Sequence, residues 1–217
     1  MGYALTQAAS EKKKQKRSPL AGWLGRKNVD TDDEDTPAIN AEAGLNRILN
    51  AKRSLPPKQK SANDQPVHDA LAAIEAALYS IDQIRDIIEQ AYDVAHSARE
   101  VEDAGGRALL AESYDELRLS INGAIEAIDD QGKILVGNSR QHIDVPLGGK
   151  AQYSISPTRL DVSAKGLNLD PPRDAFATFE EITQIMEELD KAIQRADRAA
   201  AGYCRDAQYL IVRLKSQ

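Results

Sequence analysis

Side chains that could carry acid–base, nucleophilic or metal chemistry are few in this sequence and lie far apart. The histidines are His68, His96 and His142, and none has a cysteine or carboxylate at the spacing of a zinc site. The only cysteine is Cys204. Because a reactive thiolate needs a neighbouring base and a pocket, we interpret Cys204 as a half-buried structural residue. We predict no catalytic residue, no metal site and no cofactor.

Paired carboxylates are the remaining candidates for acid–base work. Glu180 with Glu181 and Glu187 with Glu188 are such pairs, but this chemistry requires a desolvated cleft. Glu187 also precedes Lys191 by four residues, the spacing of an ion pair on an exposed helix. The chain has no Walker A sequence, dinucleotide-binding fingerprint or nucleophile elbow. The sequence therefore favours a protein that is not an enzyme.

The N-terminal residues indicate a binding segment instead. A basic run over residues 12–17 precedes an acidic run over residues 30–35, and blocks of like charge stay solvated. We predict a disordered, charged tail over residues 1–62, with a short helix near residues 39–54. Leu20, Trp23 and Leu24 follow the i, i+3, i+4 spacing of a helix that binds a groove. They are candidate partner-docking residues, although a charged tail without a partner fits the same sequence.

The composition restricts the class of protein. Of 217 residues, 41% are hydrophobic, 5% aromatic and 29% charged, which favours long helices packed side by side. The net charge of −6 argues against a nucleic-acid partner. A single cysteine excludes a disulfide within the chain. No apolar stretch reaches the roughly 18 residues of a membrane span, and no signal peptide of the general secretory route is recognisable.

Three long helices must position the side chains of residues 63–217. Apolar residues three and four apart predict helices over about 66–102 and 107–130 and a last helix from residue 179. We expect Gly105–Gly106 to end the first helix and Gly132 to end the second. The last helix keeps the alternation of three and four residues, which is typical of a coiled coil. The predicted seam residues are Leu71, Ile74, Leu78, Leu117, Ile121, Ile182, Leu189, Ile193, Leu210 and Leu214.

Residues 133–170 have a different pattern. A short apolar run at 134–136 and alternating segments at 142–145, 153–155 and 160–162 are separated by glycine and proline, among them Gly148–Gly149. This pattern predicts two or three short strands in hairpins. The expected fold is therefore mainly α, an antiparallel long-helix bundle or coiled-coil rod with a small β-hairpin region. A heptad stripe of this kind could also pair two copies of the chain.

Several segments resemble the bacterial flagellin family in the order in which they occur. Residues 75–81, EAALYSI, are similar to the family's E-G-A-L-x-E-I stretch, and residues 111–117, AESYDEL, to A-E-[FY]-x-Q-L. Residues 132–137, GKILVG, resemble N-G-K-K-L-L-x-G, and residues 161–167 the stretch before the family's C-terminal helix. Residues 64–217 as a whole resemble the inner rod domain of flagellins, which implies the helical rod fold expected above.

The resemblance also implies a function. It suggests a non-enzymatic structural or accessory protein of the bacterial flagellum, with a link to motility, that packs against flagellin or related junction subunits. The tail occupies the place of the family's N-terminal polymerisation segment, no segment resembles its C-terminal one, and the variable outer domain has no counterpart. Residues near Ile87 and Glu89 replace arginines found in many members. The alternative is a cytoplasmic regulator or adaptor that imitates flagellin and binds flagellar assembly factors. The expected location is accordingly the flagellum or the cytoplasm.

Overall fold

Residues 64–216 are the part of the chain that the structure, a computed structural model, describes. They fall in the second of the two units into which the chain divides, Ala38–Gln217. The elements in chain order are the helices α2 (Gln65–Glu100), α3 (Ala104–Glu126) and α4 (Asp130–Val136), the strands β1 (Ile143–Pro146) and β2 (Gln152–Ile155), and the helix α5 (Phe179–Lys215).

The prediction of a mainly helical chain with a small β region is confirmed. Most described residues are helical, and the two strands form one antiparallel sheet. The predicted tail, its short helix near residues 39–54 and the docking residues Leu20, Trp23 and Leu24 lie outside the described residues.

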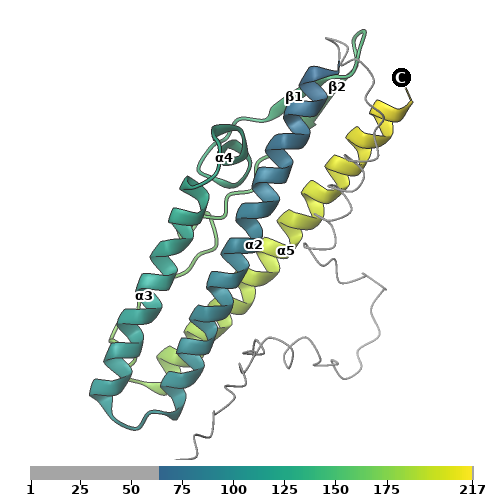
Figure 1. The fold of residues 1–217 in the computed structure, drawn as a ribbon. Helices are drawn as coiled ribbons and strands as arrows, with labels where there is room; N and C mark the ends of the chain where they lie inside the picture. The colour runs from purple at the N-terminus through teal and green to yellow at the C-terminus, as the bar shows by residue number, and fades with distance from the viewer. Residues whose placement is uncertain (1–63, 217) are drawn as a thin grey trace, which may run out of the picture. The chain divides into compact units, whose positions relative to one another are not determined.

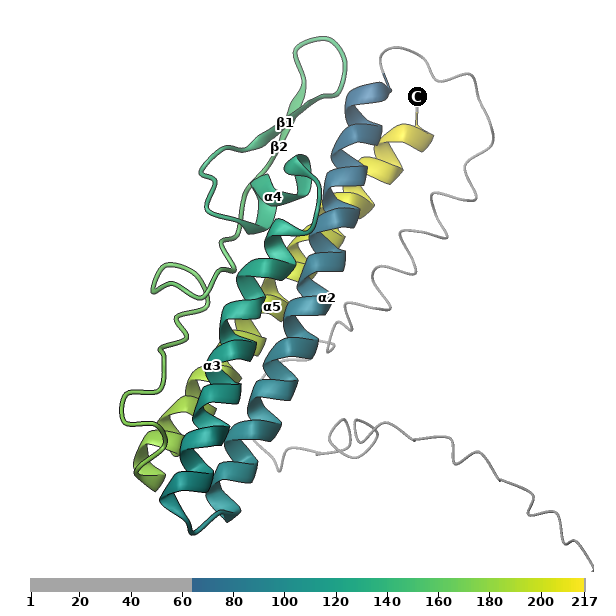
Figure 2. The same cartoon turned by 60° about the vertical axis from the view of Figure 1, so that its left-hand side comes forward.

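Helix α2 packs against both α3 and α5 (Figures 1 and 2). It runs opposite to each, since its first turn lies beside the last turn of α5 and its last turn leads directly into α3 (Figure 1). Because α2 is packed on two sides, its buried residues cover more of the helix surface than a single apolar stripe would. They combine branched aliphatic residues with alanines, which let a neighbouring helix approach closely: Val67, Leu71, Ile74, Leu78, Ile81, Ile84, Ile88, Ala70, Ala73, Ala77, Ala91, Ala95 and Ala98.

Side-chain caps fix where the other helices begin. The Asp103 carboxylate accepts a hydrogen bond from the Gly106 amide at 2.7 Å, and the Thr178 hydroxyl accepts one from the Glu181 amide at 3.2 Å. Both satisfy amides that have no partner inside the helix. Helix α5 also has acidic residues in its first turn and basic residues in its last, which suits the helix dipole.

The expectation that Gly105–Gly106 ends the first helix is wrong. Helix α2 ends where Val101 becomes extended, with φ of −93° and ψ of 116°. Both glycines lie in the first turn of α3, because Asp103 caps that turn. A Cβ on Gly106 would lie 2.9 Å from Cγ1 of Val101, so glycine permits the close turn between the helices.

The predicted strand over residues 134–136 is also wrong, as is the stop at Gly132. These residues belong to α4, which begins because the Asp129 carboxylate accepts a hydrogen bond from the Gly132 amide at 2.7 Å. Gly132 packs tightly against α2, since a Cβ there would lie 2.8 Å from the Cβ of Ala76. Burial of Leu135 and Val136 in the core outweighs the strand propensity of the sequence.

Only one of the expected hairpins is present among the described residues. Strands β1 and β2 pair with Ile143 opposite Ile155 and Val145 opposite Tyr153. The turn contains Gly148 and Gly149 at φ of 94° and 61°, a region that favours glycine. The predicted alternating strand at residues 160–162 is not formed.

Residues 156–178, here called the connection, run from β2 back to the start of α5 without regular structure (Figure 2). Their apolar side chains Leu160, Leu167, Leu169 and Phe176 are buried in the same core as the helices. Backbone bonds tie its first residues to α4, including that from the Leu160 amide to the Val136 carbonyl at 2.9 Å. The connection therefore packs as part of the helical unit.

Candidate functional site

The structure keeps the histidines and the cysteine apart. His68 is half-buried and His96 exposed, both on α2, and His142 is exposed before β1, where Nδ1 lies 3.3 Å from the Ser156 hydroxyl. Cys204 is buried on α5. The ion pair between Arg85 and Asp197, 3.0 Å apart, shows which levels of α2 and α5 lie side by side. By that register His68 lies about 15 Å along the helix from the level of Cys204.

The acidic pairs have separate structural partners. Glu187 forms a long ion pair with Lys191 at 3.9 Å on the surface. Glu181 accepts a hydrogen bond from the Asp174 amide at 3.0 Å, and Glu188 accepts a weak one from the Asp170 amide at 3.4 Å. Two of the four carboxylates therefore hold the connection on α5, a role that their sequence positions did not indicate.

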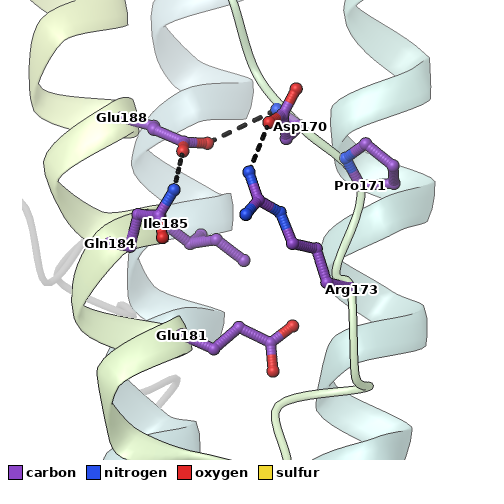
Figure 3. Close-up of a pocket in the computed structure, with 7 residues that line it drawn as sticks. All are labelled: Asp170, Pro171, Arg173, Glu181, Gln184, Ile185 and Glu188. Atoms are coloured by element: carbon purple, nitrogen blue, oxygen red, sulfur yellow. Dashed lines mark hydrogen bonds and ion pairs between the residues drawn. The ribbon is translucent and has the colours of Figure 1, made fainter.

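A small cavity lies where the connection meets α5 (Figure 3). Its volume is about 10 Å³, close to the least that holds one water molecule. The α5 side contributes Glu181, Gln184, Ile185 and Glu188, and the connection contributes Asp170, Pro171 and Arg173. Arg173 forms an ion pair with Asp170 at 3.1 Å, and Gln184 donates to Glu188 at 3.0 Å. This place joins two elements and is too small for an organic substrate.

The opposite side of the same segment is fixed by α3. The Tyr114 hydroxyl donates to the Asp170 carbonyl at 3.1 Å, and its ring packs against Phe176 with centroids 5.6 Å apart. Burial raises the pKa of the Tyr114 hydroxyl, so it remains a donor. Arg118, paired with Asp115 at 2.7 Å, reaches the Leu169 carbonyl at 3.4 Å. The middle of the connection is thus bound to α3 and α5 at once.

Tyr203 anchors the start of the connection. Its hydroxyl donates to the Leu135 carbonyl at 2.6 Å and accepts from the Thr158 amide at 2.9 Å. The same Thr158 amide lies 2.7 Å from the Leu135 carbonyl, so three polar groups share one buried site. Burial, above all, raises the pKa of Tyr203 to about 12. The hydroxyl joins α5, α4 and the connection.

Arg107 anchors the end of the connection. Its guanidinium donates to four backbone carbonyls: those of Val101 and Glu102 after α2, at 3.0 and 2.7 Å, and those of Phe176 and Ala177 before α5, at 2.8 and 3.1 Å. These four carbonyls belong to segments about 75 residues apart in the chain, and the planar guanidinium is suited to join them. One side chain thereby ties the ends of three helices together.

The predicted seam residues occupy the inside of the helical unit. Seven are buried: Leu71, Ile74, Leu78, Ile121, Ile182, Leu189 and Leu210. Leu117, Ile193 and Leu214 are partly buried against the same core. The buried face of α5 is wider than the predicted stripe, since Ile185 and Ile211 are buried as well.

Comparisons with known proteins add no assignment: no model of a protein family and no curated protein matches the chain. Among residues 64–216, no helix has the length and apolar character of a membrane span. Within the same range, no group of three or more His, Cys, Asp or Glu side chains is placed to hold a metal ion. The described residues therefore form packed helices that hold the connection firmly, and their outer surface is what remains for contact with other molecules.

Proposed function

We propose that this chain is a non-enzymatic structural or accessory protein of the bacterial flagellum. Its helices would form a flagellin-like antiparallel bundle, a coiled-coil rod that packs against flagellin or a related filament or junction subunit. The observation that carries the proposal is the order of elements in residues 64–216. Two long helices and the short helix α4 are followed by a hairpin, an irregular connection and a last long helix. Apart from α4, this is the order that the resemblance implies.

The segments that resemble flagellin lie at positions with demanding geometry, which supports the proposal. Residues 132–137 lie in and just after α4, where Gly132 allows contact with Ala76 of α2. Residues 161–167 form a tight loop in which the Leu167 amide donates to the Asp161 carbonyl at 2.7 Å. A Cβ on Gly166 would collide with that carbonyl. A resemblance at such positions is informative, because a larger residue than glycine would not fit there.

The binding of the connection suits a part that must present a fixed surface to a neighbour. Arg107, Tyr114 and Tyr203 hold it at its end, middle and start. Pre-organisation of this kind reduces the entropy lost on association. Single large apolar side chains remain exposed on the outside, among them Leu109 and Leu119 of α3 and Val212 of α5, at 67%, 51% and 66%. They could contribute contacts in such an assembly.

Co-sedimentation with flagellar filaments tests the proposal. The full-length chain is mixed with filaments sheared from the cells that produce it, and the pellet is compared with that from actin filaments. We expect the chain to pellet with flagellar filaments in a saturable way. The variants Val212→Glu and Leu119→Glu, each changing one exposed apolar side chain, would show whether α5 or α3 faces the filament.

The proposal fails if the folded chain stays in the supernatant both with long flagellar filaments and with short fragments that are rich in filament ends. Circular dichroism of the unpelleted protein shows whether it is folded, so that failure to bind is not confused with unfolding. Binding to soluble flagellin or to assembly factors alone would favour the cytoplasmic imitator over a filament component.

A further inference from the structure

The outer face of α5 carries a regular stripe of residues, here called the outer stripe. Its members follow one another in alternating steps of four and three, so they lie in one line opposite the buried face of the helix. All are exposed except Ala201, which is half-buried. Residues on the two flanks of the stripe contact the rest of the unit: Asp197 pairs with Arg85 of α2 at 3.0 Å, and Arg195 donates to the Lys165 carbonyl of the connection at 2.8 Å. The outer stripe consists of Glu180, Gln184, Glu187, Lys191, Gln194, Arg198, Ala201, Arg205, Gln208 and Val212.

Opposite charges are separated along the outer stripe. Its N-terminal half carries the carboxylates of Glu180 and Glu187, and its C-terminal half carries the guanidinium groups of Arg198 and Arg205. Glu180, Arg198 and Arg205 form neither a hydrogen bond nor an ion pair with another described residue. Glu187 has only the long contact of 3.9 Å with Lys191, and its side chain is 65% exposed. These four charged groups can therefore pair with charges on another molecule.

We propose that the outer stripe pairs antiparallel with the outer stripe of a second copy of the chain. Glu187 and Arg198 lie equally far from one point on the helix, just after Ala192, and so do Glu180 and Arg205. A two-fold axis at that point places each Glu187 beside the partner's Arg198 and each Glu180 beside the partner's Arg205. By symmetry each of these pairs of opposite charge occurs twice in the dimer.

The same charges disfavour other arrangements of the two helices. If the helices ran parallel and in register, Glu187 would face Glu187 and Arg198 would face Arg198, and like charges repel. A shift of the antiparallel pair by seven residues would leave Arg205 without a carboxylate in the stripe. In the proposed register, the level nearest the axis pairs Lys191 with Gln194, so no like charges meet there.

The dimer should be weak, because exposed ion pairs contribute little each. Both copies carry a net charge of −6, but at about 0.1 M salt this repulsion is screened beyond about 10 Å, whereas the ion pairs act at short range. The stems of the long charged side chains can also cover apolar surface in the contact. The pairing needs no flagellar component, so this inference stands apart from the proposed function, and its failure would leave that proposal unchanged.

Sedimentation equilibrium of the full-length chain at about 0.1 M salt measures the association. We expect the weight-average mass to rise from that of one chain towards that of two as the concentration increases over about 10–500 μM, as suits a small polar contact. Glu187→Arg and Arg198→Glu should each weaken the dimer at least about tenfold, because each turns two attractive pairs per dimer into repulsive ones.

An equal mixture of these two variants tests the register. In the mixed dimer the introduced arginine meets the introduced glutamate, and the unchanged Arg198 of one chain meets the unchanged Glu187 of the other. We therefore expect the mixture to associate about as strongly as the unmodified chain, although each variant alone does not.

Two matched controls account for the change in net charge. Glu112→Arg on α3 and Lys150→Glu in the hairpin turn make the same charge changes at exposed positions away from the outer stripe. Both should leave the association unchanged, and circular dichroism should show an intact helical fold in all four variants.

Three results would overturn the proposal. The chain could remain a monomer at every concentration. It could associate equally well in Glu187→Arg and Arg198→Glu, or be weakened as much by the two controls, which would place the contact on another surface. The mixture could associate no better than the separate variants, which would show that Glu187 and Arg198 do not meet.

Discussion

Arg107 offers the sharpest test of how the three helix ends are held together. The substitution Arg107→Met keeps the aliphatic stem of the side chain, so packing changes little, and it removes every guanidinium donor. Four carbonyls then lose their partner: those of Val101, Glu102, Phe176 and Ala177.

The magnitude follows from the exposure of those carbonyls. Hydrogen bonds to a charged donor contribute about 1.5–3 kcal/mol each. Two of the four, to Glu102 and Ala177, are exposed, and water can replace the donor there. The two to Val101 and Phe176 are only partly buried, so water offsets part of their contribution as well. Taking about 1–2 kcal/mol for each of these two bonds, we expect the free energy of unfolding to fall by about 2–4 kcal/mol. Loss of the cation placed 5.4 Å from the Phe179 ring centroid adds a smaller effect.

Urea unfolding followed by far-UV circular dichroism measures this change. The midpoint should fall while the slope stays constant, which indicates lower stability with an unchanged mechanism. The stability of Arg107→Lys should lie between those of the unmodified chain and Arg107→Met, because an ammonium group cannot reach all four carbonyls. Arg140→Met, at an exposed arginine outside the helices, should stay within about 0.5 kcal/mol of the unmodified chain. A loss no larger for Arg107→Met than for Arg140→Met would refute this account of the helix ends.

Three other perturbations test the packing and the buried hydroxyl. Gly132→Ala should lower the free energy of unfolding by about 1–3 kcal/mol, because the new Cβ meets Ala76 at 2.8 Å. Gly123→Ala has nothing within 4 Å and should raise it by about 0.5–1 kcal/mol. Urea unfolding that ranks the two variants in the opposite order would contradict both predictions. Leu189→Glu places a carboxylate where the side chain is 1% exposed. We expect a strongly lowered melting temperature, because an unpaired buried charge is costly. A melting curve unchanged by the substitution would contradict the place of Leu189 in the core. Because burial raises the pKa of Tyr203 from 10 to about 12, the folded state keeps a proton that the unfolded state loses; stability should fall from pH 10 towards 12, and less steeply in Tyr203→Phe.

The helical faces could be predicted from the sequence, because periodicity records which side of a helix is buried. Leu71, Ile74 and Leu78 recur every three or four residues and are all buried. The hairpin could also be predicted from the sequence, since Gly148 and Gly149 adopt the positive φ that its turn requires. In both cases the signal is local and lies within one element.

What could not be predicted depends on contacts between distant segments. Residues 134–136 have strand propensity, yet the Asp129 cap and the contact of Gly132 with α2 make them helical. The connection has no periodicity, because its polar groups bind to α3, α4 and α5 instead of a neighbouring strand. Arg107 looks like any charged residue in an amphipathic helix. Tyr114 and Tyr203, aromatic residues with a polar tip inside apolar helical stripes, were recognisable signs of buried hydrogen bonds.

The flagellar role is tested most directly by an immunoblot of three fractions from the native cells: sheared flagella, culture medium and cytosol. Antibodies against the folded chain are used, with flagellin and a cytosolic enzyme as markers. The proposal predicts a signal in the sheared flagella that disappears when the filaments are genetically removed. A signal confined to the cytosol, with flagellin present in the sheared fraction, would contradict it and favour a regulator that imitates flagellin.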